Sequence, residues 1–344
     1  MTRWFEKVKN DPSNIVSSRV RLSRNWEEYK FPSRLDEDEA RYMVGQMTQE
    51  LKNLKETDGR RYECRTLEKM EELDRMELRE RRLLNKTLME KTTPGSIIYS
   101  EDEAVSLVLN GDDHIRLQVL APGLRLKECY EEADRLDDYI NEKFPYAFSS
   151  KYGYLTSYPT NVGTGMKASV VVHLPSLSTS KRFQELLGDM SRFGTTVRGV
   201  YGRGSENSGD LYEIYNQKTL GVNEQEIMEL VSNVAVQLSG QEREVREASL
   251  AKHRLLREDE VYKSYGVLKY ARKLSMKEAM TFLSHLRAGI ADGLVETKEF
   301  VSIYNIMIGI QPANLQKYSR QPLGKDELEV ARGRYIREHL PELK

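Results

Sequence analysis

A change in the spacing of apolar residues near Ser96 limits the possible folds of this chain more than any other feature. Before it, apolar residues recur every three or four positions, whereas after it they follow a period of two in three short runs. A period of two indicates half-buried β-strands, and the Asp- and Gly-containing turns between the runs predict an antiparallel meander. The three runs cover residues 96–99, 104–109 and 115–120.

The elements expected beyond the meander alternate irregularly between strands and helices. The patterns predict strands at residues 168–174, 197–201 and 211–215, and helices at residues 127–143 and 178–193. A parallel sheet would require regular strand–helix–strand units, which this order does not provide. We therefore predict the α+β class, with an antiparallel sheet flanked by helices.

Helical periodicity dominates both ends of the chain. Apolar residues at three- and four-residue steps predict helices at residues 36–56 and 66–90. Asn223, followed three residues later by Glu226, predicts the capped start of a helix of about thirty residues. Only helical patterns follow, so we expect an α+β domain over residues 1–245 and a C-terminal all-helical domain over residues 246–344.

The composition excludes several classes of protein. The chain has 344 residues, of which 53 are basic and 54 acidic, so its net charge of −1 disfavours nucleic acid and confines any anion site to a local cluster. Two cysteines and five scattered histidines provide neither a disulfide framework nor a structural metal site. No apolar run approaches the roughly 18 residues of a membrane span, and the N-terminus lacks a signal core, so we expect a cytoplasmic location without membrane contact.

Four motifs combine charge with turn residues. The first is Ser17-Ser18-Arg19-Val20-Arg21, in which the two arginines project to one side if the segment is extended. Paired guanidinium groups suit phosphate oxygens, because each can donate two parallel hydrogen bonds. The alternative interpretation is an edge strand with two surface arginines.

The second motif is a turn that carries two carboxylates and a histidine, followed by Arg116. Asp112 or Asp113 could orient a cationic substrate or act as a base. The alternative is a hairpin turn in which Asn110, Gly111 and the aspartates serve only the backbone.

The third and fourth motifs are glycine-bearing loops next to strands. Residues 157–169 form a Gly- and Thr-rich loop that leads into a strand at Lys167, where main-chain N–H groups can approach phosphate. Residues 197–210 end a strand in a loop with several glycines around Arg203 and Glu206, which suits a lid over substrate. The alternative for this last loop is a plain surface hairpin.

In order and spacing, these motifs resemble the phosphagen kinase (ATP:guanidino phosphotransferase) superfamily, and within it the bacterial protein arginine kinases of the McsB type. The resemblance covers nearly the whole chain. The strings that carry it are SSRVRLSRN, NGDDHIRLQ, GYLTSYPTNVGTGMKASVVVHLP, RFGTTVRGVYGRGSE, YNQKTLG, VYKSYGVLKYARKLS and LSHLRAGIADGLV.

The resemblance implies transfer of the γ-phosphoryl group of Mg-ATP to arginine side chains of proteins. Arginines would hold the triphosphate, carboxylates would grip the acceptor, and Mg²⁺ would arrive with the nucleotide. The implied catalytic residues are Asp112, Arg116, Arg203 and Glu206, and Asp112, Tyr158 and Glu206 would contact the acceptor. The implied nucleotide-binding residues are Ser17, Ser18, Arg19, Val20, Arg21, Arg116, Lys167, Ala168, Ser169, Val170, Val171, Arg198, Gly199, Val200, Tyr201, Gly202 and Arg203.

The chain departs from the family pattern mainly on the acceptor side. Asp112 and Arg203 stand where the family usually has the two glutamates that grip the guanidinium, and Tyr158 replaces a cysteine. Lys167 replaces an arginine of the phosphate clamp, which keeps the charge but loses the fork. Three hypotheses follow. The first is an active kinase in which Asp112, Asp113 or Glu206 grips the acceptor, the second is a weakened or inactive relative that binds ATP or protein partners, and the third is a kinase with another acceptor, an anionic group recruited by Arg203.

The C-terminal part carries the remaining implications of the resemblance. The family commonly has an Arg-Asp-x-x-Arg-Ala motif that recognises phosphoarginine at an allosteric site, and the matching positions here include Glu329 and Arg332. The resemblance also implies a homodimer, protein substrates with exposed arginine, an activator protein, and a role in protein quality control that marks substrates for a Clp-type ATPase.

Overall fold

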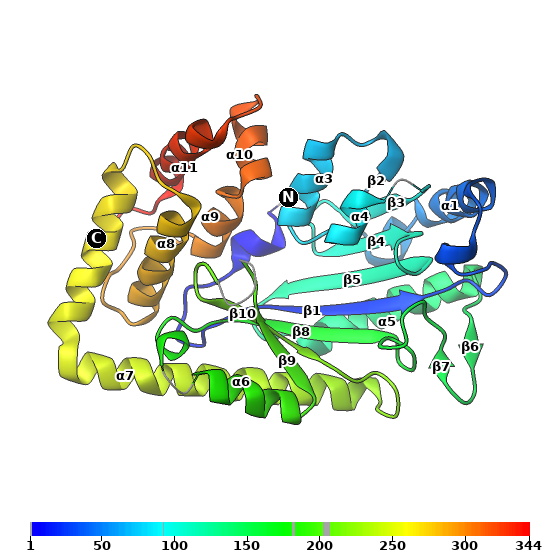
Figure 1. The fold of residues 1–344 in the computed structure, drawn as a ribbon, viewed down its shortest axis with the longest axis horizontal. Helices are drawn as coiled ribbons and strands as arrows, with labels where there is room; N and C mark the ends of the chain where they lie inside the picture. Colours follow the sequence, from blue (N-terminus) through cyan, green and yellow to red (C-terminus); the bar gives the residue numbers. More distant parts are fainter. Residues whose placement is uncertain (1, 92, 181–182, 202–206) are drawn as a thin grey trace.

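A computed structural model describes residues 2–91, 93–180, 183–201 and 207–344. In these residues, eight strands form one antiparallel sheet at the centre of the molecule (Figure 1). The predicted meander and the α+β class are confirmed. In spatial order the strands are β2 (Tyr62–Thr66), β3 (Ser96–Ser100), β4 (Val105–Leu109), β5 (Ile115–Pro122), β1 (Ile15–Arg24), β8 (Met166–His173), β10 (Leu211–Asn216) and β9 (Thr195–Gly199), and a separate ribbon pairs β6 (Phe148–Ser149) with β7 (Gly153–Tyr154).

Helices surround this sheet, and the C-terminal ones gather beyond one of its ends (Figure 1). None of the helices in the described ranges is both long and apolar enough to cross a membrane. The helices are α1 (Glu37–Leu51), α2 (Lys55–Asp58), α3 (Glu72–Glu80), α4 (Lys86–Glu90), α5 (Leu126–Lys143), α6 (Phe183–Arg192), α7 (Glu224–Tyr270), α8 (Met276–Ala291), α9 (Ile303–Gly309), α10 (Pro312–Ser319) and α11 (Lys325–His339).

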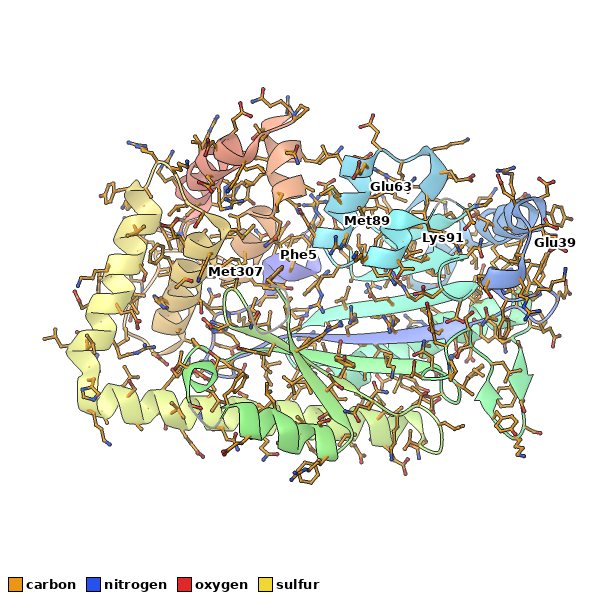
Figure 2. All side chains as sticks on the ribbon, viewed as in Figure 1. Phe5, Glu39, Glu63, Met89, Lys91 and Met307 are labelled. Carbon is orange, nitrogen blue, oxygen red and sulfur yellow. The ribbon has the colours of Figure 1, made fainter. Side chains whose placement is uncertain are left out.

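The two faces of the sheet are covered differently. One face packs on α1, α5 and the first part of α7 through a continuous apolar core that includes Val20, Leu117 and Val170. On the other face, α3 and α4 cover β3 and β4, while the C-terminal helices and the N-terminal turn cover the opposite end. Figure 2 shows Phe5 and Met307, which both belong to this C-terminal core. The part of this face between the two packed regions carries Arg19 and Arg21 of β1 and Lys167 of β8, and we call it the polar strip.

The single helix predicted over residues 66–90 is wrong. The segment instead begins at the last residue of β2 and contains a short 3-10 turn (Leu67–Lys69), α3 and α4. Helix α3 stops because Arg82 has a left-handed backbone (φ +71°), and the Leu83 N–H returns to the Leu78 carbonyl at 2.8 Å. Helix α4 then begins at its own cap, where the Asn85 side chain accepts from the Leu88 N–H. Most of the apolar residues that predicted one helix are buried together in one core, but two short helices and the turns beside them carry these residues.

Helix α7 begins at the predicted cap and is longer than expected. The Asn223 side chain accepts from the Glu226 N–H, and the Glu226 side chain accepts from the Asn223 N–H. The helix continues to Tyr270, with non-helical dihedral angles at His253, where it bends sharply (Figure 1). The domain boundary expected at residue 245 lies within the first arm of this helix.

Candidate active site

Neighbouring strands place positively charged side chains on the polar strip. In β1, Arg19 and Arg21 alternate with Val20, which is fully buried on the other face. Antiparallel pairing sets Arg19 opposite Ser169 of β8 and Arg21 opposite Lys167. Side chains that lie opposite each other in a ladder share a face, so strand register alone gathers these groups. β1 is a central strand, which removes the alternative of two arginines on an edge.

The Glu213 carboxylate of β10 lies among these cations. Its Oε1 accepts from Arg19 Nη2 at 2.7 Å, Arg82 Nη2 at 2.5 Å and Ser169 Oγ at 3.1 Å. Its Oε2 accepts from Arg198 Nη2 of β9 at 2.9 Å. Burial alone would raise the pKa of this carboxyl, but the three guanidinium groups hold it well below its ordinary value. Glu213 is therefore a fixed anion that keeps three arginines together.

Three further cations have no carboxylate partner among the described residues. Arg116 Nη2 donates to the Leu83 carbonyl at 3.1 Å, whereas its Nε is buried without a hydrogen-bond partner. Lys167 Nζ donates to two main-chain carbonyls at the end of β10, at 3.2 and 3.0 Å. Arg21 makes no hydrogen bond or ion pair within the part of the chain that the structure describes. These donors remain available to a ligand.

Burial and mutual repulsion disfavour the charged forms of several of these cations. They lower the pKa of Arg19 to about 9, that of Arg116 to about 9, and that of Lys167 to about 8. An anion with several oxygens would relieve this crowding and satisfy the free donors. We call the whole group the cation cluster; its members are Arg19, Arg21, Arg82, Arg116, Lys167 and Arg198.

The cation cluster has the chemistry of a polyphosphate site. Guanidinium forks donate pairs of hydrogen bonds to phosphate oxygens, and the buried Arg116 Nε is a donor that a phosphate would satisfy. The described residues hold no group of three or more His, Cys, Asp or Glu side chains arranged to bind a metal ion.

Asp112 lies at the edge of the cation cluster, in the turn between β4 and β5. Its side chain is half-buried, and its Oδ2 accepts from Asn85 Nδ2 at 3.2 Å. Asn85 lies two residues after Leu83, whose carbonyl accepts from Arg116 Nη2, so Asp112 lies beside this part of the cation cluster. Its negative charge favours the charged forms of Arg21 and Arg116 and so raises their pKa values. A carboxylate in this position can grip a cationic acceptor that approaches a bound phosphate.

Asp113 is engaged elsewhere and serves the backbone. It is 2% exposed, and its Oδ1 accepts from Asn25 Nδ2 at 2.8 Å and from the Ser157 N–H at 2.7 Å. It thereby joins the end of β1 to the loop that contains Tyr158. The turn interpretation of this motif is correct for Asp113.

His114 is likewise structural. Its Nδ1 accepts from the Trp26 N–H at 3.1 Å, so the proton is on Nε2, which donates to the Lys30 carbonyl at 2.9 Å. Burial lowers its pKa to about 4, which keeps the ring neutral near pH 7. This histidine therefore orders the turn and contributes no charge to the site.

Tyr158 projects from the loop that precedes β8. Its side chain is 52% exposed, and its carbonyl accepts from Thr156 Oγ1 at 2.9 Å. In the same loop, Ser157 Oγ is buried without a hydrogen-bond partner in the described residues. The Tyr158 side chain of this loop is therefore exposed to solvent, whereas most side chains of the neighbouring strands are buried.

Several residues implied as nucleotide-binding direct their side chains away from the cation cluster. Ser18 Oγ donates to the Gly123 carbonyl and accepts from the Arg125 N–H, both at 2.8 Å, on the α5 side of the sheet. Val20, Ala168 and Val170 are fully buried in the core on that same side. Successive side chains of β1 and β8 point to opposite faces of the sheet, which explains this division. Ser17, Ser169 and Val171 therefore lie on the same face as Arg19. Val171 packs in the core beneath the C-terminal helices.

The lid motif is described only at its margins. Gly202, Arg203 and Glu206 lie outside the described residues, so their implied roles remain predictions. Before them, β9 ends at Gly199, and the Val200 N–H donates to the Leu211 carbonyl at 2.9 Å. The carbonyl of Tyr201 accepts from the Ser208 N–H at 2.8 Å, which brings the two ends of the loop together.

The two positions implied in phosphoarginine recognition lie on α11. Arg332 is 3% exposed, and it donates to the carbonyls of Leu274 at 2.9 Å and Ile310 at 3.3 Å. Glu329 accepts from Lys273 Nζ at 3.3 Å. Arg332 is thus committed to backbone carbonyls between helices.

Two members of the site were missed in the sequence. Glu213 lies in β10 and fits the alternation of that strand. Nothing in the local sequence shows that three arginines from other segments surround it. Arg82 sits in a charged run that the helical pattern assigned to solvent. Its only sequence signal is the end of an apolar stripe at Leu83 and Leu84, which is compatible with a helix end.

Comparison with known families supports the geometry. The family described as "ATP:guanido phosphotransferase, C-terminal catalytic domain" matches residues 42–245, and "Protein-arginine kinase McsB C-terminal domain" matches residues 254–344. The protein-arginine kinase of Clostridium acetobutylicum is 37% identical over 99% of this chain and 100% of that protein. The chain belongs to the protein-arginine kinase family. The Bacillus subtilis member is 38% identical over 99% of this chain and 93% of its own length.

Solved structures of other guanidino kinases share the fold of this protein-arginine kinase family member. A taurocyamine kinase from Schistosoma mansoni with bound transition-state analog components gives a TM-score of 0.61 at 21% identity, over 79% of this chain and 41% of that one. A lombricine kinase gives 0.60 at 22% identity, over 72% of each chain. At these identities the likeness concerns the fold, and it agrees with the resemblance inferred from the motifs.

Proposed function

We propose that this protein transfers the γ-phosphoryl group of ATP to arginine side chains of proteins. The observation that supports this most strongly is the cation cluster beside Asp112, which would pair a polyphosphate site with a carboxylate for a cationic acceptor. Membership of the protein-arginine kinase family agrees with this reaction. The nucleotide would lie along the polar strip, with its phosphates on the guanidinium groups and its magnesium ion bound to the phosphates.

In the proposed step, a guanidinium nitrogen of the acceptor attacks the γ-phosphorus. A nitrogen–phosphorus bond forms, the bond from phosphorus to the β–γ bridging oxygen breaks, and ADP leaves. The acceptor nitrogen loses one proton, which Asp112 would accept, because a free guanidinium has a pKa above about 12 and is a poor nucleophile while protonated. The cation cluster would align the chain of phosphates and neutralise the charge that develops on them.

The direct test uses the purified full chain, Mg-ATP and an unstructured arginine-rich protein. We expect acid-labile phosphate on arginine, measured by mass spectrometry under neutral conditions, and strongly reduced labelling at subsaturating ATP when Arg21→Ala replaces the wild-type chain. The matched control is Arg135→Ala, which removes an exposed arginine from α5 on the far side of the sheet. Bound ATP without any phosphoarginine would contradict the proposed transfer.

A second candidate function is a weakened relative that binds ATP and protein partners without rapid transfer. The observation that favours it is the commitment of Asp113 to Asn25 and Ser157, which leaves Asp112 as the carboxylate of this turn that can face an acceptor. Asp112 is one methylene shorter than glutamate, and misplacement by about 1 Å can reduce a rate roughly 100-fold. Turnover regained in the double variant Asp112→Glu with Arg203→Glu, but absent from the wild-type chain, would favour this candidate.

We also propose the cellular setting that the family resemblance implies. In it, the protein acts as a cytoplasmic homodimer on proteins with exposed arginine, under the control of an activator protein, and its products are delivered to a Clp-type ATPase. Sedimentation of the purified chain tests the dimer. Pull-down of a Clp ATPase by phosphorylated substrate, compared with unphosphorylated substrate, tests delivery.

A further inference from the structure

Arg82 occupies a backbone position that arginine rarely takes. It follows the last turn of α3 with φ +71°, in the left-handed region where helices usually end on glycine. Its N–H donates to the Arg79 carbonyl at 2.9 Å, and the next N–H, that of Leu83, returns to the Leu78 carbonyl. A side chain at such a strained position persists where its surroundings fix it, and strained positions gather at functional sites.

The side chain of Arg82 reaches into the cation cluster. Its Nη2 lies 2.5 Å from the Glu213 oxygen that also binds Arg19 at 2.7 Å, so two guanidinium groups share one oxygen. Its Nη1 is buried and faces the Tyr304 hydroxyl of α9, with which it makes no hydrogen bond of good geometry. The side chain is 11% exposed. This donor therefore lacks a well-aligned acceptor, and a phosphate oxygen beside Glu213 would supply one.

The residues on either side of Arg82 connect it to two different parts of the molecule. On the C-terminal side, the Leu83 carbonyl accepts from Arg116 Nη2 at 3.1 Å, and the Arg82 carbonyl accepts from Gln118 Nε2 at 3.0 Å. Both donors belong to β5, so the main chain here is attached to a strand of the cation cluster.

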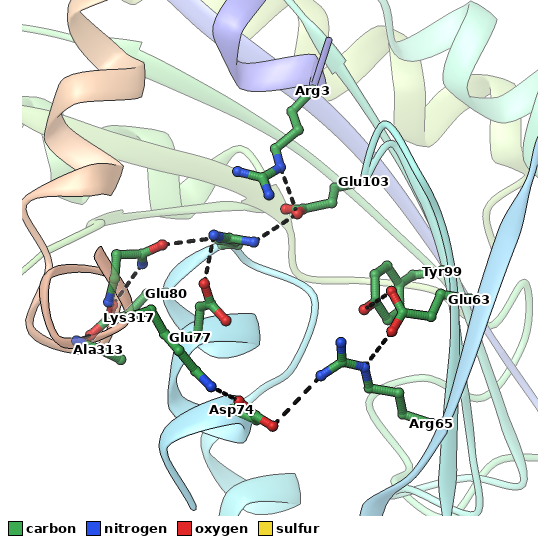
Figure 3. Close-up of polar contacts among 12 residues, drawn as sticks. Arg3, Glu63, Arg65, Asp74, Glu77, Glu80, Tyr99, Glu103, Ala313 and Lys317 are labelled. Atoms are coloured by element: carbon green, nitrogen blue, oxygen red, sulfur yellow. Dashed lines mark hydrogen bonds and ion pairs between the residues drawn. The ribbon is translucent and has the colours of Figure 1, made fainter. Parts of the chain in front are cut away.

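On the N-terminal side, Glu80 caps a helix of the C-terminal region. Its carboxylate accepts from the Ala313 and Asn314 N–H groups, both at 2.9 Å, and from Asn314 Nδ2 at 2.7 Å. Figure 3 shows Glu80 beside Ala313 at the start of α10. A carboxylate at a helix N-terminus satisfies free N–H groups and interacts favourably with the helix dipole.

Arg81 strengthens the same connection. Its Nε donates to Asn314 Oδ1 at 3.0 Å, and its other nitrogens lie 3.0 Å from Glu103 and 2.6 Å from Glu77. Lys317 of α10 also pairs with Asp74 of α3. Of these four consecutive residues, Glu80 and Arg81 therefore bind α10, and Arg82 and Leu83 contact the cation cluster.

We propose that Arg82 binds a phosphate of the nucleotide as an additional member of the clamp, and that Glu80 positions it by capping α10. This inference rests on the proposed nucleotide binding. It makes the C-terminal helices part of the nucleotide site, because the main chain that carries Arg82 is fixed between α10 and β5. Glu80 contacts no ligand and acts only through the position of Arg82.

The test measures binding of Mg-ATP, Mg-ADP and AMP by calorimetry to the full chain. We expect Arg82→Ala to weaken ATP binding about tenfold or more, ADP binding less, and AMP binding not at all, because the lost contact is to the outer phosphates. Arg82→Lys should recover part of the ATP affinity. Arg79→Ala is the matched control, since it removes an exposed charge from the same helix and should change nothing.

A double-variant cycle tests the positioning role of Glu80. Glu80→Gln should weaken ATP binding severalfold in the wild-type background and leave it unchanged in the Arg82→Ala background, since Glu80 then has nothing to position. If Arg82→Ala does not fold, Arg82→Lys and Glu80→Gln still decide the outcome through their ATP-to-AMP ratios.

The outcomes separate this inference from the proposed function. Wild-type ATP binding that Arg82→Ala leaves unchanged overturns the inference alone. Equal losses for ATP and AMP indicate a purely structural Arg82 and also overturn it. A wild-type chain that binds no ATP overturns both the inference and the proposed nucleotide site.

Discussion

The proposed nucleotide side and the proposed acceptor side of the candidate active site are built in different ways. The nucleotide side stands on the adjacent strands β5, β1, β8, β10 and β9, whose register fixes the cations and Glu213 against one another. The residues proposed for the acceptor side are Asp112 in a turn, Tyr158 in a loop, and Arg203, which lies outside the described residues. Strand pairing therefore fixes the proposed nucleotide side, whereas a turn and a loop carry the described residues of the proposed acceptor side.

This difference shows where sequence can change without loss of the fold. A cation on a central strand is surrounded by neighbours on both sides, so its replacement disturbs several contacts at once. A turn or loop side chain such as Tyr158, which is half exposed, can be exchanged with little structural cost. Substitutions in the turn and the loop can therefore change which acceptor such a site binds without changing its nucleotide-binding residues.

The largest expected effect is on stability, at Glu213. Glu213→Gln leaves three guanidinium groups without their shared anion, so we expect the free energy of unfolding to fall by about 3 kcal/mol. Saturating Mg-ATP should recover more stability in this variant than in the wild type, because phosphate replaces the lost carboxylate. Thermal unfolding with and without nucleotide measures both, and Glu142→Gln on α5 is the exposed control. An unchanged melting temperature would show that the strands do not depend on Glu213.

Glu213 also gives the wild type a defined acid sensitivity. Its pKa is lower in the folded state than the ordinary value of 4.5, so the unfolded state binds more protons and stability falls as the pH drops below about 4.5. The glutamine variant should lack this component. Urea unfolding at a series of pH values compares the two chains.

The second effect is on nucleotide affinity, at Arg21. This side chain has no partner in the described residues, so Arg21→Ala removes a ligand contact without breaking an internal one. We expect ATP to bind about 100-fold more weakly, from the loss of charge-assisted hydrogen bonds, while stability stays the same or rises. Calorimetry with Mg-ATP measures the affinity. A large loss of stability would indicate that Arg21 is structural.

The third effect is on turnover, at Asp112. Asp112→Glu extends the carboxylate toward the acceptor, and we expect phosphoarginine formation to increase about tenfold with little change in ATP affinity. Initial rates at saturating ATP measure it. Asp138→Glu, the same change on an exposed face of α5, should have no effect. A drop in ATP affinity with no gain in rate would assign Asp112 to the nucleotide side.

The smallest effect is a pH dependence at Lys167. Burial and Arg21 lower its pKa to about 8, so the side chain loses its charge as the pH rises above that value. ATP affinity should therefore fall severalfold between pH 7.5 and pH 9, since binding then requires uptake of a proton. Lys167→Arg should bind ATP with little change over this range. The same slope in both chains would place its origin in another group.

The strands and capped helices of this protein were predictable because their signals are local. Residues 96–120 alternate, and Asn223 with Glu226 forms its capping box within four positions. The helix over residues 66–90 was mispredicted because its apolar stripe does not reveal the left-handed backbone of Arg82. That conformation depends on contacts with α10 and β5, which are distant in the sequence.

The site was predictable to a similar extent. The alternation of Arg19 and Arg21 correctly placed both side chains on one face, because parity within a strand follows from covalent geometry. Their meeting with Glu213 and Arg198 depends on the order of strands in the sheet, which a single sequence does not encode locally. Arg82 and Glu213 were missed for this reason.

The bend in α7 at His253 has a consequence for how the molecule unfolds. The arm before the bend contributes Ile227, Val231 and Leu238 to the core under the sheet, and the arm after it contributes Val261 and Leu268 to the core of the C-terminal helices. The two arms of α7 thus pack in different cores but belong to one continuous helix. Melting of either core removes the packing that keeps half of this helix ordered, so the two halves of the protein should lose structure in a single cooperative transition.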